Sequence, residues 1–578
     1  MLNYKNSFLI CCLFSCGFCL STIAQPTDNS YCNPLNLNYR FSYNSPSYRE
    51  AADPVIHLYK GKYFLYASKS GGYWYGDDMI KWEYRPSKTL PVEDYAPTVE
   101  TIHDTVFFIA SSGAGKIYYN TNPLEDNWKV YNPKFSVFMT DPALFKDEDG
   151  RVYLYYGCSS KDPIMGVELN PLHMLDTMGT PKVLIGHHAK EYGWEEQGEE
   201  NQNGKEGWNE GSWMTKHSGK YYLQYASPGT QFKVYGDGVY QADYPLGPFT
   251  YMPNSPFSYK PGGFINGAGH GCTFQDKFGN YCHVATMAIS VRNMFERRIG
   301  LFPAFFDAEG ELHCNTAFGD YPMLVPKRKM DFQKETLSAG WMLLSYKKSI
   351  TASSSLSGHT PMLACDEEVR TSWSAASGNK GEWLQLDLLK NLTIHAIQVN
   401  FTDEGSTLKA GNRIKPYQYL ILASTDGISW KKVIDKSANI EDVTHDYVVL
   451  SEPVHARFVK LINLQVPDGN FSVSDLRIFG KGKGQSPNAV KKYSILRQSP
   501  DTREALLSWT PDIHATGYIV YYGTQKNKLY NSIMVYDTSK LKMSGLNRGV
   551  PYFFRVDSFN ENGITKGKKS GSKLAELE

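Results

Sequence analysis

A hairpin pattern that recurs five times in the first part of the chain constrains its fold more than any other feature. Each unit has an acidic or Gly/Pro-containing start, a first strand, a polar turn and a second strand that is usually rich in Tyr. Each turn carries Gly or Asp, as hairpin turns require. The units are residues 53–68, 96–111, 141–156, 210–225 and 269–284.

Five hairpins in a row suit a radial array of small sheets with one sheet per blade, so the pattern predicts a five-bladed β-propeller. An open β-sandwich built from the same hairpins is the alternative, but five matching starts favour the propeller. The wider spacing between the third and fourth starts indicates inserted loops. The acidic, Gly-rich stretch 192–208 is the expected insertion.

The chain has 578 residues, which is too long for one hydrophobic core. From Lys347 onward, short runs of alternating apolar residues are typical of β-sandwiches. We therefore expect an all-β protein with a propeller over residues 28–345, followed by two β-sandwich domains over 346–482 and 488–574.

Residues 1–24 are typical of an export signal, with Lys5 before an apolar run and small residues before the cleavage point. Cys16 follows Leu-Phe-Ser, which resembles a bacterial lipoprotein processing site, so a lipid anchor at Cys16 stays an alternative. No other segment could cross a membrane. The expected location is periplasmic, cell-surface or extracellular. A net charge of +1 argues against a nucleic-acid partner.

Six cysteines lie outside the signal and are scattered, which argues against a disulfide scaffold or a zinc cluster. Cys272 and Cys282 flank a predicted turn at residues 276–279 and could face each other across a hairpin. Either a disulfide or two buried free thiols fits this spacing.

The five units resemble glycoside hydrolase family 43, whose propeller carries an acidic residue at three blade starts. The Asp-Pro at Asp53, the Asp-Pro at Asp141 and the Glu-Gly at Glu210 match those places. His270, in Gly-His-Gly, matches the axial histidine of the family. The resemblance covers roughly residues 28–340 and implies an inverting glycoside hydrolase.

The resemblance makes Asp53 the general base, Glu210 the general acid and Asp141 the residue that raises the pKa of Glu210. Inverting hydrolysis needs two carboxyl groups about 6.5–9.5 Å apart so that a water molecule fits between them. Blade starts on different sides of one axis can aim such side chains at a shared pocket. A nearby like charge helps to keep the acid protonated.

The chemistry requires no cofactor, but the resemblance allows a structural calcium ion or a water molecule beside His270 in the channel. Arg297 matches a family arginine that reaches the sugar or the acid, and Arg298 is its close rival.

Trp74, Tyr95 and Trp208 border the repeat units and could form a platform for the sugar, or they could be buried between blades. Four further acidic residues near the fourth unit are expected to lie in a solvated loop, because like charges so close seldom serve as one buried acid. They are Glu195, Glu196, Glu199 and Glu200.

Residues 346–482 resemble the discoidin-like (coagulation factor 5/8 type C) module, although this chain lacks the usual Asp-Gly before Thr371-Ser-Trp373. Residues 488–574 resemble a fibronectin type III domain, with Trp509 and Tyr552 at core positions.

The expected activity is exo-acting removal of a terminal pentose or furanose from an oligosaccharide or polysaccharide of plants or microbes. α-L-Arabinofuranose is the first choice, and β-D-galactofuranosidase and β-xylosidase activities are alternatives. A carbohydrate-binding surface protein without catalysis is an alternative from a different functional class, but the set of Asp53, Asp141 and Glu210 argues against it. An adhesion protein built on the two C-terminal sandwiches would leave the propeller unexplained.

Overall fold

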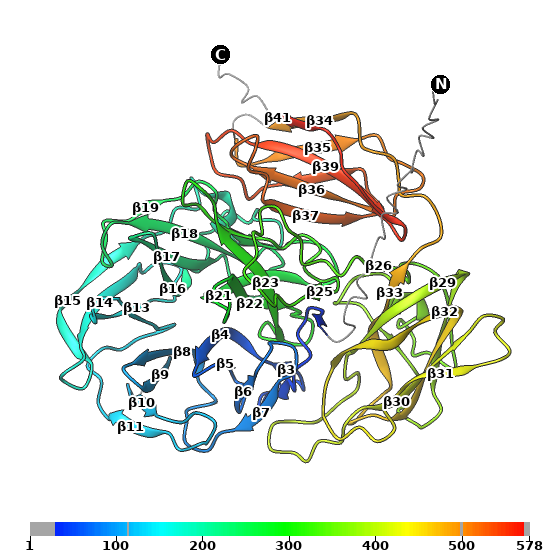
Figure 1. Ribbon diagram of the computed structural model, residues 1–578, viewed down its shortest axis with the longest axis horizontal. Helices are drawn as coiled ribbons and strands as arrows, with labels where there is room; N and C mark the ends of the chain where they lie inside the picture. Colours follow the sequence, from blue (N-terminus) through cyan, green and yellow to red (C-terminus); the bar gives the residue numbers. More distant parts are fainter. Residues whose placement is uncertain (1–28, 112–114, 498–500, 572–578) are drawn as a thin grey trace, which may run out of the picture.

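The computed structural model describes residues 29–111, 115–497 and 501–571 (Figure 1). Within these ranges the only helices are two short 3-10 turns, η1 (Gly193–Glu195) and η2 (Pro361–Ala364), so the all-β prediction is confirmed. No helix of the described part is long and apolar enough to cross a bilayer. The predicted export signal and Cys16 lie outside the described residues.

Five antiparallel sheets stand around a common centre and form the predicted propeller (Figure 1). Each predicted hairpin supplies the first two strands of one sheet, and two more strands follow in chain order, or three in the fourth blade. The first three blades contain β4 (Ala52–Tyr59), β5 (Lys62–Ser68), β6 (Gly72–Gly76), β7 (Glu83–Pro86); β8 (Tyr95–Ile102), β9 (Thr105–Ser111), β10 (Ile117–Asn120), β11 (Lys129–Asn132); and β12 (Ala143–Lys146), β13 (Val152–Tyr156), β14 (Ile164–Asn170), β15 (Asp176–Ile185). The last two contain β16 (Glu210–His217), β17 (Lys220–Ser227), β18 (Gly236–Ala242), β19 (Thr250–Tyr251), β20 (Ser258–Tyr259); and β21 (Asn266–Gln275), β22 (Tyr281–Ala288), β23 (Arg297–Phe306), β24 (Leu312–Cys314).

The ring closes where the first blade meets the fifth. The backbone N–H of Asp53 in β4 donates to Thr286 Oγ1 in β22 at 2.7 Å. The segment before the first blade runs along β23, where Leu35 N–H donates to the carbonyl of Ile299. Two small pairings flank this segment, β1 (Ser30–Tyr31) with β25 (Met323–Leu324) and β2 (Arg40–Phe41) with β3 (Arg49–Glu50). The N-terminal segment therefore belongs to the propeller core.

The second domain is a β-sandwich that packs beside the first and fifth blades (Figure 1). Its sheet starts before residue 346, because Met342 and Leu343 already pair with Gly480 and Phe479. Its core is apolar and includes the fully buried Trp373. The strands are β26 (Met342–Leu343), β27 (Ser349–Ala352), β28 (Trp373–Ser374), β29 (Trp383–Phe401), β30 (Gln418–Ser424), β31 (Lys431–Asp435), β32 (His445–Gln465) and β33 (Ser472–Lys481).

The third domain is a smaller sandwich of two sheets. Trp509 and Tyr552 are buried in its core, as predicted. The same apolar cluster includes Val234 and Tyr259 of the propeller, so this domain is packed onto the fourth blade. The strands are β34 (Tyr493–Arg497), β35 (Ala505–Trp509) and β38 (Lys540–Met543) in one sheet, and β36 (Gly517–Gly523), β37 (Asn531–Tyr536), β39 (Phe553–Asn560), β40 (Gly563–Thr565) and β41 (Lys569–Gly571) in the other.

All cysteines of the described part are free thiols. Cys272 lies opposite Val284 and Cys282 lies opposite Phe274 in the β21–β22 pair, so the two sulfur atoms do not face each other. Both side chains are buried in an apolar cluster that the fifth blade shares with the first. The buried-thiol alternative is therefore confirmed, and the disulfide is absent.

Candidate functional site

The blade starts share a backbone conformation that side chains other than Gly seldom adopt. Asp53, Asp141 and His270 have φ values of 51°, 49° and 44°. Such a left-handed residue costs roughly 1–2 kcal/mol unless it is Gly. Ala96, at the start of the second blade, has the same conformation with a φ of 48°, so this backbone geometry belongs to the repeat and recurs at charged and uncharged starts alike.

Hydroxyl groups at the ends of second strands support these strained residues. Ser111 Oγ accepts the N–H of Asp141 at 2.8 Å, and Thr286 Oγ1 accepts the N–H of Asp53. Each bond links one blade to the next. The sequence carries a signal for this support, because the first two units both end in Ala-Ser and Ala-Thr286 directly follows the fifth.

Glu210 stands one residue earlier in the repeat than the two aspartates. Its strand partner is Ala226, just as Ala52 pairs with Ser68 in the first blade. The residue with positive φ in the fourth blade is Gly211, at 62°. The sequence-based alignment of Glu210 with Asp53 was therefore wrong by one position. The longer side chain of Glu210 starts from a different point of the blade.

The three acidic side chains nevertheless meet around one imidazole ring. His270 Nδ1 lies 3.3 Å from Asp53 Oδ1 and 3.7 Å from Asp141 Oδ2. The side-chain ligand atoms of Asp141, Cys158 and Glu210 all lie within 4.8 Å of one another. Gly211 permits this arrangement, since a Cβ there would come within 2.6 Å of the His270 ring.

The carboxylate of Asp53 is buried but surrounded by groups that stabilise its charge. Ser68 Oγ donates to Oδ2 at 2.5 Å, and Arg297 Nη1 donates to Oδ1 at 3.1 Å. Burial by itself would raise the pKa of Asp53, but the charges of Arg297 and His270 outweigh it and lower the pKa. Asp53 is therefore ionised at neutral pH and can accept a proton.

Arg297 is held from both sides. Its Nη2 donates to Glu50 Oε1 at 2.7 Å and its Nη1 to Thr230 Oγ1 at 3.2 Å, in addition to its bond to Asp53. The predicted arginine thus reaches a candidate catalytic carboxylate. Its rival Arg298 points to His445 of the second domain instead.

The carboxyl group of Glu210 has the opposite environment. Burial and the negative charge of Asp141 raise the pKa of Glu210 to about 7. Tyr235 Oη donates to Oε1 at 2.5 Å and Cys158 Sγ donates to Oε2 at 3.1 Å. Glu210 therefore keeps a large protonated fraction at neutral pH.

Cys158 and Tyr235 were not among the predicted site residues. Burial raises the pKa of the Cys158 thiol far above its ordinary value, as do the nearby charges of Asp141 and Glu210. The thiol thus stays protonated and donates to a carboxylate. Since Cys158 lies 52 residues before Glu210, only the packing of the third blade against the fourth reveals this contact.

Comparison with known proteins agrees with this geometry. Residues 43–310 match the family model described as glycosyl hydrolases family 43, and residues 349–478 match the F5/8 type C domain. Residues 43–310 are a glycosyl hydrolase family 43 domain. The three candidate acids and His270 all lie within it.

Three curated proteins with similar sequences are glycosidases. A β-xylosidase of Xylanibacter ruminicola is 30% identical over 132 residues, covering 20% of this chain and 40% of that protein. A β-D-galactofuranosidase of Aspergillus niger is 25% identical over 242 residues, covering 35% of this chain and 64% of that protein. A xylosidase/arabinosidase of Bacteroides ovatus is 24% identical and covers 35% of this chain and 76% of that protein. The chain spans less than two thirds of the first two relatives.

The aromatic residues predicted as a sugar platform have three different outcomes in the family 43 domain. Trp74 is fully buried inside the first blade, so its predicted role as a sugar contact was wrong. Tyr95 is half-buried and its ring lies 5.7 Å from the guanidinium of Arg297. Trp208 is 43% exposed and stands two residues before Glu210. Tyr95 and Trp208 therefore remain available to a substrate.

The acidic insertion of the family 43 domain divides into two parts. Glu199 and Glu200 are exposed, as expected. Glu195 and Glu196 are buried, which contradicts the prediction of a solvated loop. Glu195 accepts a bond from Tyr225 Oη, and burial raises the pKa of Glu195 to about 7. Glu196 pairs with Arg503 of the third domain. These two residues anchor the insertion.

His270 forms no metal-ligand cluster with other described side chains. The two candidate clusters of the described part are Asp141–Cys158–Glu210 and Asp307–Glu311–His313, and Lys528 Nζ already pairs with Asp307 in the second. The carboxylate oxygens of Asp53 and Asp141, 3.3 and 3.7 Å from His270 Nδ1, are ligands of the kind that calcium prefers. The calcium ion beside His270 stays a prediction, and no chemical step proposed below uses it.

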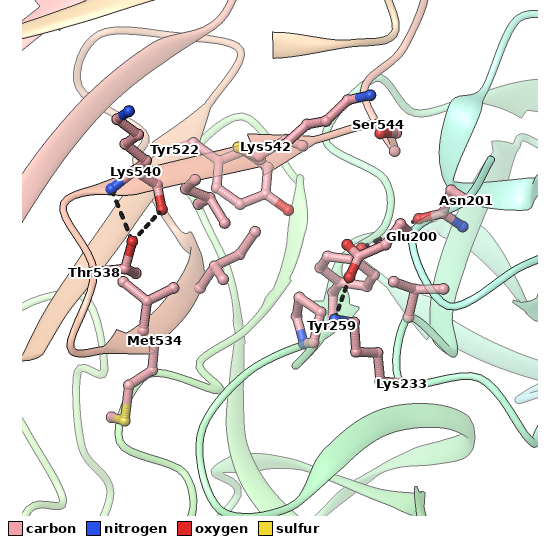
Figure 2. Close-up of a pocket in the computed structure, with 17 residues that line it drawn as sticks. Glu200, Asn201, Lys233, Tyr259, Tyr522, Met534, Thr538, Lys540, Lys542 and Ser544 are labelled. Carbon is pink, nitrogen blue, oxygen red and sulfur yellow. Dashed lines mark hydrogen bonds and ion pairs between the residues drawn. The ribbon is translucent and has the colours of Figure 1, made fainter. Parts of the chain in front are cut away.

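A separate pocket of about 320 Å³ lies between the family 43 domain and the third domain (Figure 2). Figure 2 shows Thr538 and Lys540 on one side of the space and Lys233 and Glu200 on the other. None of the predicted site residues, all of which the structure describes, lines this pocket. The candidate active site is the cluster of acids around His270, which lies apart from this pocket.

Proposed function

We propose that the chain is an inverting, exo-acting glycoside hydrolase, with Asp53 as general base and Glu210 as general acid. The observation that carries the proposal is the contrast between these two carboxyl groups at one site. Arg297 and His270 lower the pKa of Asp53, whereas burial and Asp141 raise that of Glu210 to about 7. One ionised and one protonated carboxyl group are what acid–base hydrolysis of a glycoside requires.

The proton movements follow from these states. Asp53 accepts a proton from a water molecule as the water oxygen bonds to the anomeric carbon. Glu210 gives its proton to the glycosidic oxygen as the bond to the leaving group breaks, so the leaving group departs as an alcohol. The sugar is released with inverted configuration, and a proton passes from Asp53 to solvent while Glu210 takes one up.

For the substrate we propose a terminal pentose or furanose of an oligosaccharide or polysaccharide, with α-L-arabinofuranose as first choice. The names of the similar proteins, which include a xylosidase/arabinosidase and a β-D-galactofuranosidase, support this range. β-Xylosidase and β-D-galactofuranosidase activities are the alternatives. The same pair of acids would serve each sugar, and the strand start at Tyr95 and the loop that carries Trp208 would select among them.

Hydrolysis of a panel of nitrophenyl glycosides tests the proposal. We expect release from the α-L-arabinofuranoside, and proton NMR of the first product should show the anomer opposite to that of the substrate. Retention of configuration would exclude Asp53 as a general base toward water. Sugar binding by calorimetry without hydrolysis of any glycoside would favour the non-catalytic carbohydrate-binding alternative.

We further propose that the protein is exported, with a lipid anchor at Cys16 as an alternative to cleavage ahead of Gln25. The third domain is proposed to be a fibronectin type III domain, because its two antiparallel sheets pack around Trp509 as in β-sandwiches of that kind. Metabolic labelling with palmitate, with a Cys16→Ser variant as control, tests the anchor.

A further inference from the structure

At two neighbouring strand ends of the propeller, the side chains on one face point toward the candidate acids and those on the other face point toward the discoidin-like domain. Glu50 ends β3, and Arg297 begins β23. The side chain of Arg297 bonds to both Glu50 and Asp53. Because consecutive side chains of a strand point to opposite faces, Arg49 and Arg298 must point away from the acids. These two arginines meet the discoidin-like domain.

Arg49 of the propeller is fully buried between two carboxylates of the discoidin-like domain. Its Nε lies 2.7 Å from Asp403 Oδ2, and its Nη1 lies 2.5 Å from Asp442 Oδ2. Both acids also accept a second bond from Nη2, at 3.1 and 3.0 Å. A doubly bidentate arginine of this kind holds its backbone in one position.

Arg298 adds a second link on the same face. Its Nε donates to His445 Nε2 at 2.8 Å, and its Nη1 donates to the carbonyl of Arg49 at 2.8 Å. Burial and the charges of Arg298 and Arg49 lower the pKa of His445 well below its ordinary value, so the ring is neutral and Nε2 accepts. The other ring nitrogen faces Asn400 Oδ1 at 2.8 Å. The strand ends are thus fixed to the discoidin-like domain by groups with complementary hydrogen-bonding roles.

A third contact between the two domains involves the loop that supports Arg297. Arg370 of the discoidin-like domain donates to the carbonyl of Gln231 at 3.2 Å and to that of Ile289 at 2.8 Å. Thr230, the neighbour of Gln231, accepts the bond from Arg297. The loop that supports Arg297 is therefore attached to the second domain as well.

We propose that the discoidin-like domain positions the catalytic base, because Arg49 and Arg370 connect it to the strand and the loop that hold Arg297 against Asp53. This inference rests on the proposed role of Asp53. The domain is then an integral part of the active site, and Asp403, Asp442 and Arg370 are positioning residues that act on Asp53 through Arg297.

The test compares Asp403→Asn and Arg370→Gln with an Asp387→Asn control. Asp387 pairs with Arg457 inside the discoidin-like domain, so its loss removes an ion pair of the same domain that does not touch the propeller. Arg370 is 24% exposed and its ion-pair partner Glu199 is 46% exposed, so we expect Arg370→Gln to keep the fold even if Asp403→Asn proves unstable. The substrate is the nitrophenyl glycoside that the wild-type chain cleaves fastest, and circular dichroism checks the fold.

We expect kcat to fall about tenfold in both variants with little change in KM, since a small displacement of a catalytic group slows the reaction more than it weakens binding. The acidic limb of the kcat/KM profile should also move to higher pH, because Asp53 would lose part of the stabilisation by Arg297. The groups that face Asp53 are Arg297, His270, Glu50, Asp141, Tyr95 and Tyr235. None of them is altered in these variants.

Wild-type kcat and an unmoved acidic limb in folded Arg370→Gln and Asp403→Asn protein would overturn the inference, as would a change in KM alone. Failure of the proposed function is a separate result, because it would show as wild-type turnover in an Asp53→Asn variant of the intact chain. The Asp387→Asn control should keep the kcat and the pH profile of the wild type.

Discussion

The two sides of the candidate site use the same blade geometry to produce opposite protonation states. On the side of Asp53, a guanidinium and two hydroxyl groups approach a buried carboxylate. On the side of Glu210, a second carboxylate lies close and no arginine or lysine contacts the acid among the described residues. Since both carboxyl groups are buried, the neighbours of each group decide which one carries the proton, and neither its residue type nor its burial does.

Removing either carboxyl group should have the largest effect on the rate of hydrolysis, because the reaction needs one ionised and one protonated carboxyl group. Glu210→Gln and Asp53→Asn keep nearly the same volume and are expected to reduce kcat by about 1000-fold, because general acid–base catalysis contributes on that scale. Stopped assays with an oligosaccharide substrate, whose sugar leaving group has a high pKa, measure the loss. Folded protein with a wild-type rate would refute the assigned roles. A leaving group of low pKa should lessen the loss for Glu210→Gln only.

Removing the cation from the side of Asp53 should make that side resemble the side of Glu210. Arg297→Gln leaves Asp53 and Glu50 close together without their shared partner, so the pKa of Asp53 should rise. We expect a loss of about 100-fold in kcat/KM at neutral pH. Since Asp53 must be ionised, the acidic limb of the pH–rate profile should move to higher pH. An unmoved acidic limb would contradict the role given to Arg297.

Removing the negative charge beside Glu210 should make this side resemble the side of Asp53. In the wild type, Glu210 must be protonated, so kcat/KM should fall as pH rises through about 7. Asp141→Asn removes a charge that raises the pKa of Glu210, so this basic limb should move to lower pH. The rate at neutral pH should fall roughly tenfold. A basic limb that stays in place would show that Asp141 does not control Glu210.

Of these four changes, removal of the Cys158 thiol should have the smallest effect on the rate of hydrolysis. Its hydrogen bond to Glu210 stabilises the carboxylate form and so lowers the pKa of Glu210. Cys158→Ala should therefore move the basic limb to higher pH and change kcat by less than about tenfold. Cys158→Ser is the matched control, because its hydroxyl group can still donate. Identical pH profiles for the Ala and Ser variants would exclude a role for this bond.

Much of the propeller could be predicted from the sequence, because a strand–turn–strand unit is encoded locally. The alternation of side chains and the Gly or Asp at each turn mark the hairpins, and their number equals the number of blades. The regular starts also identified Asp53, Asp141 and His270, since equivalent positions of a repeat face the same axis. The alignment of Glu210 failed by one residue because Gly211, rather than an acid, occupies the left-handed position there.

Only the tertiary structure decided which side chains meet across blades and domains. Alternation along a strand shows that the side chain of Trp74 lies on one of the two faces of its sheet, but it does not show whether that face is exposed. The neighbouring blade buries it. Cys158 approaches Glu210, and Arg49 approaches Asp403, over 52 and 354 residues of chain. Such contacts depend on how finished sheets pack against one another, and a pattern of period two contains no information about that packing. The sequence by itself determined the repeating unit and its acidic starts, and the packing around the axis determined the protonation state of each acid.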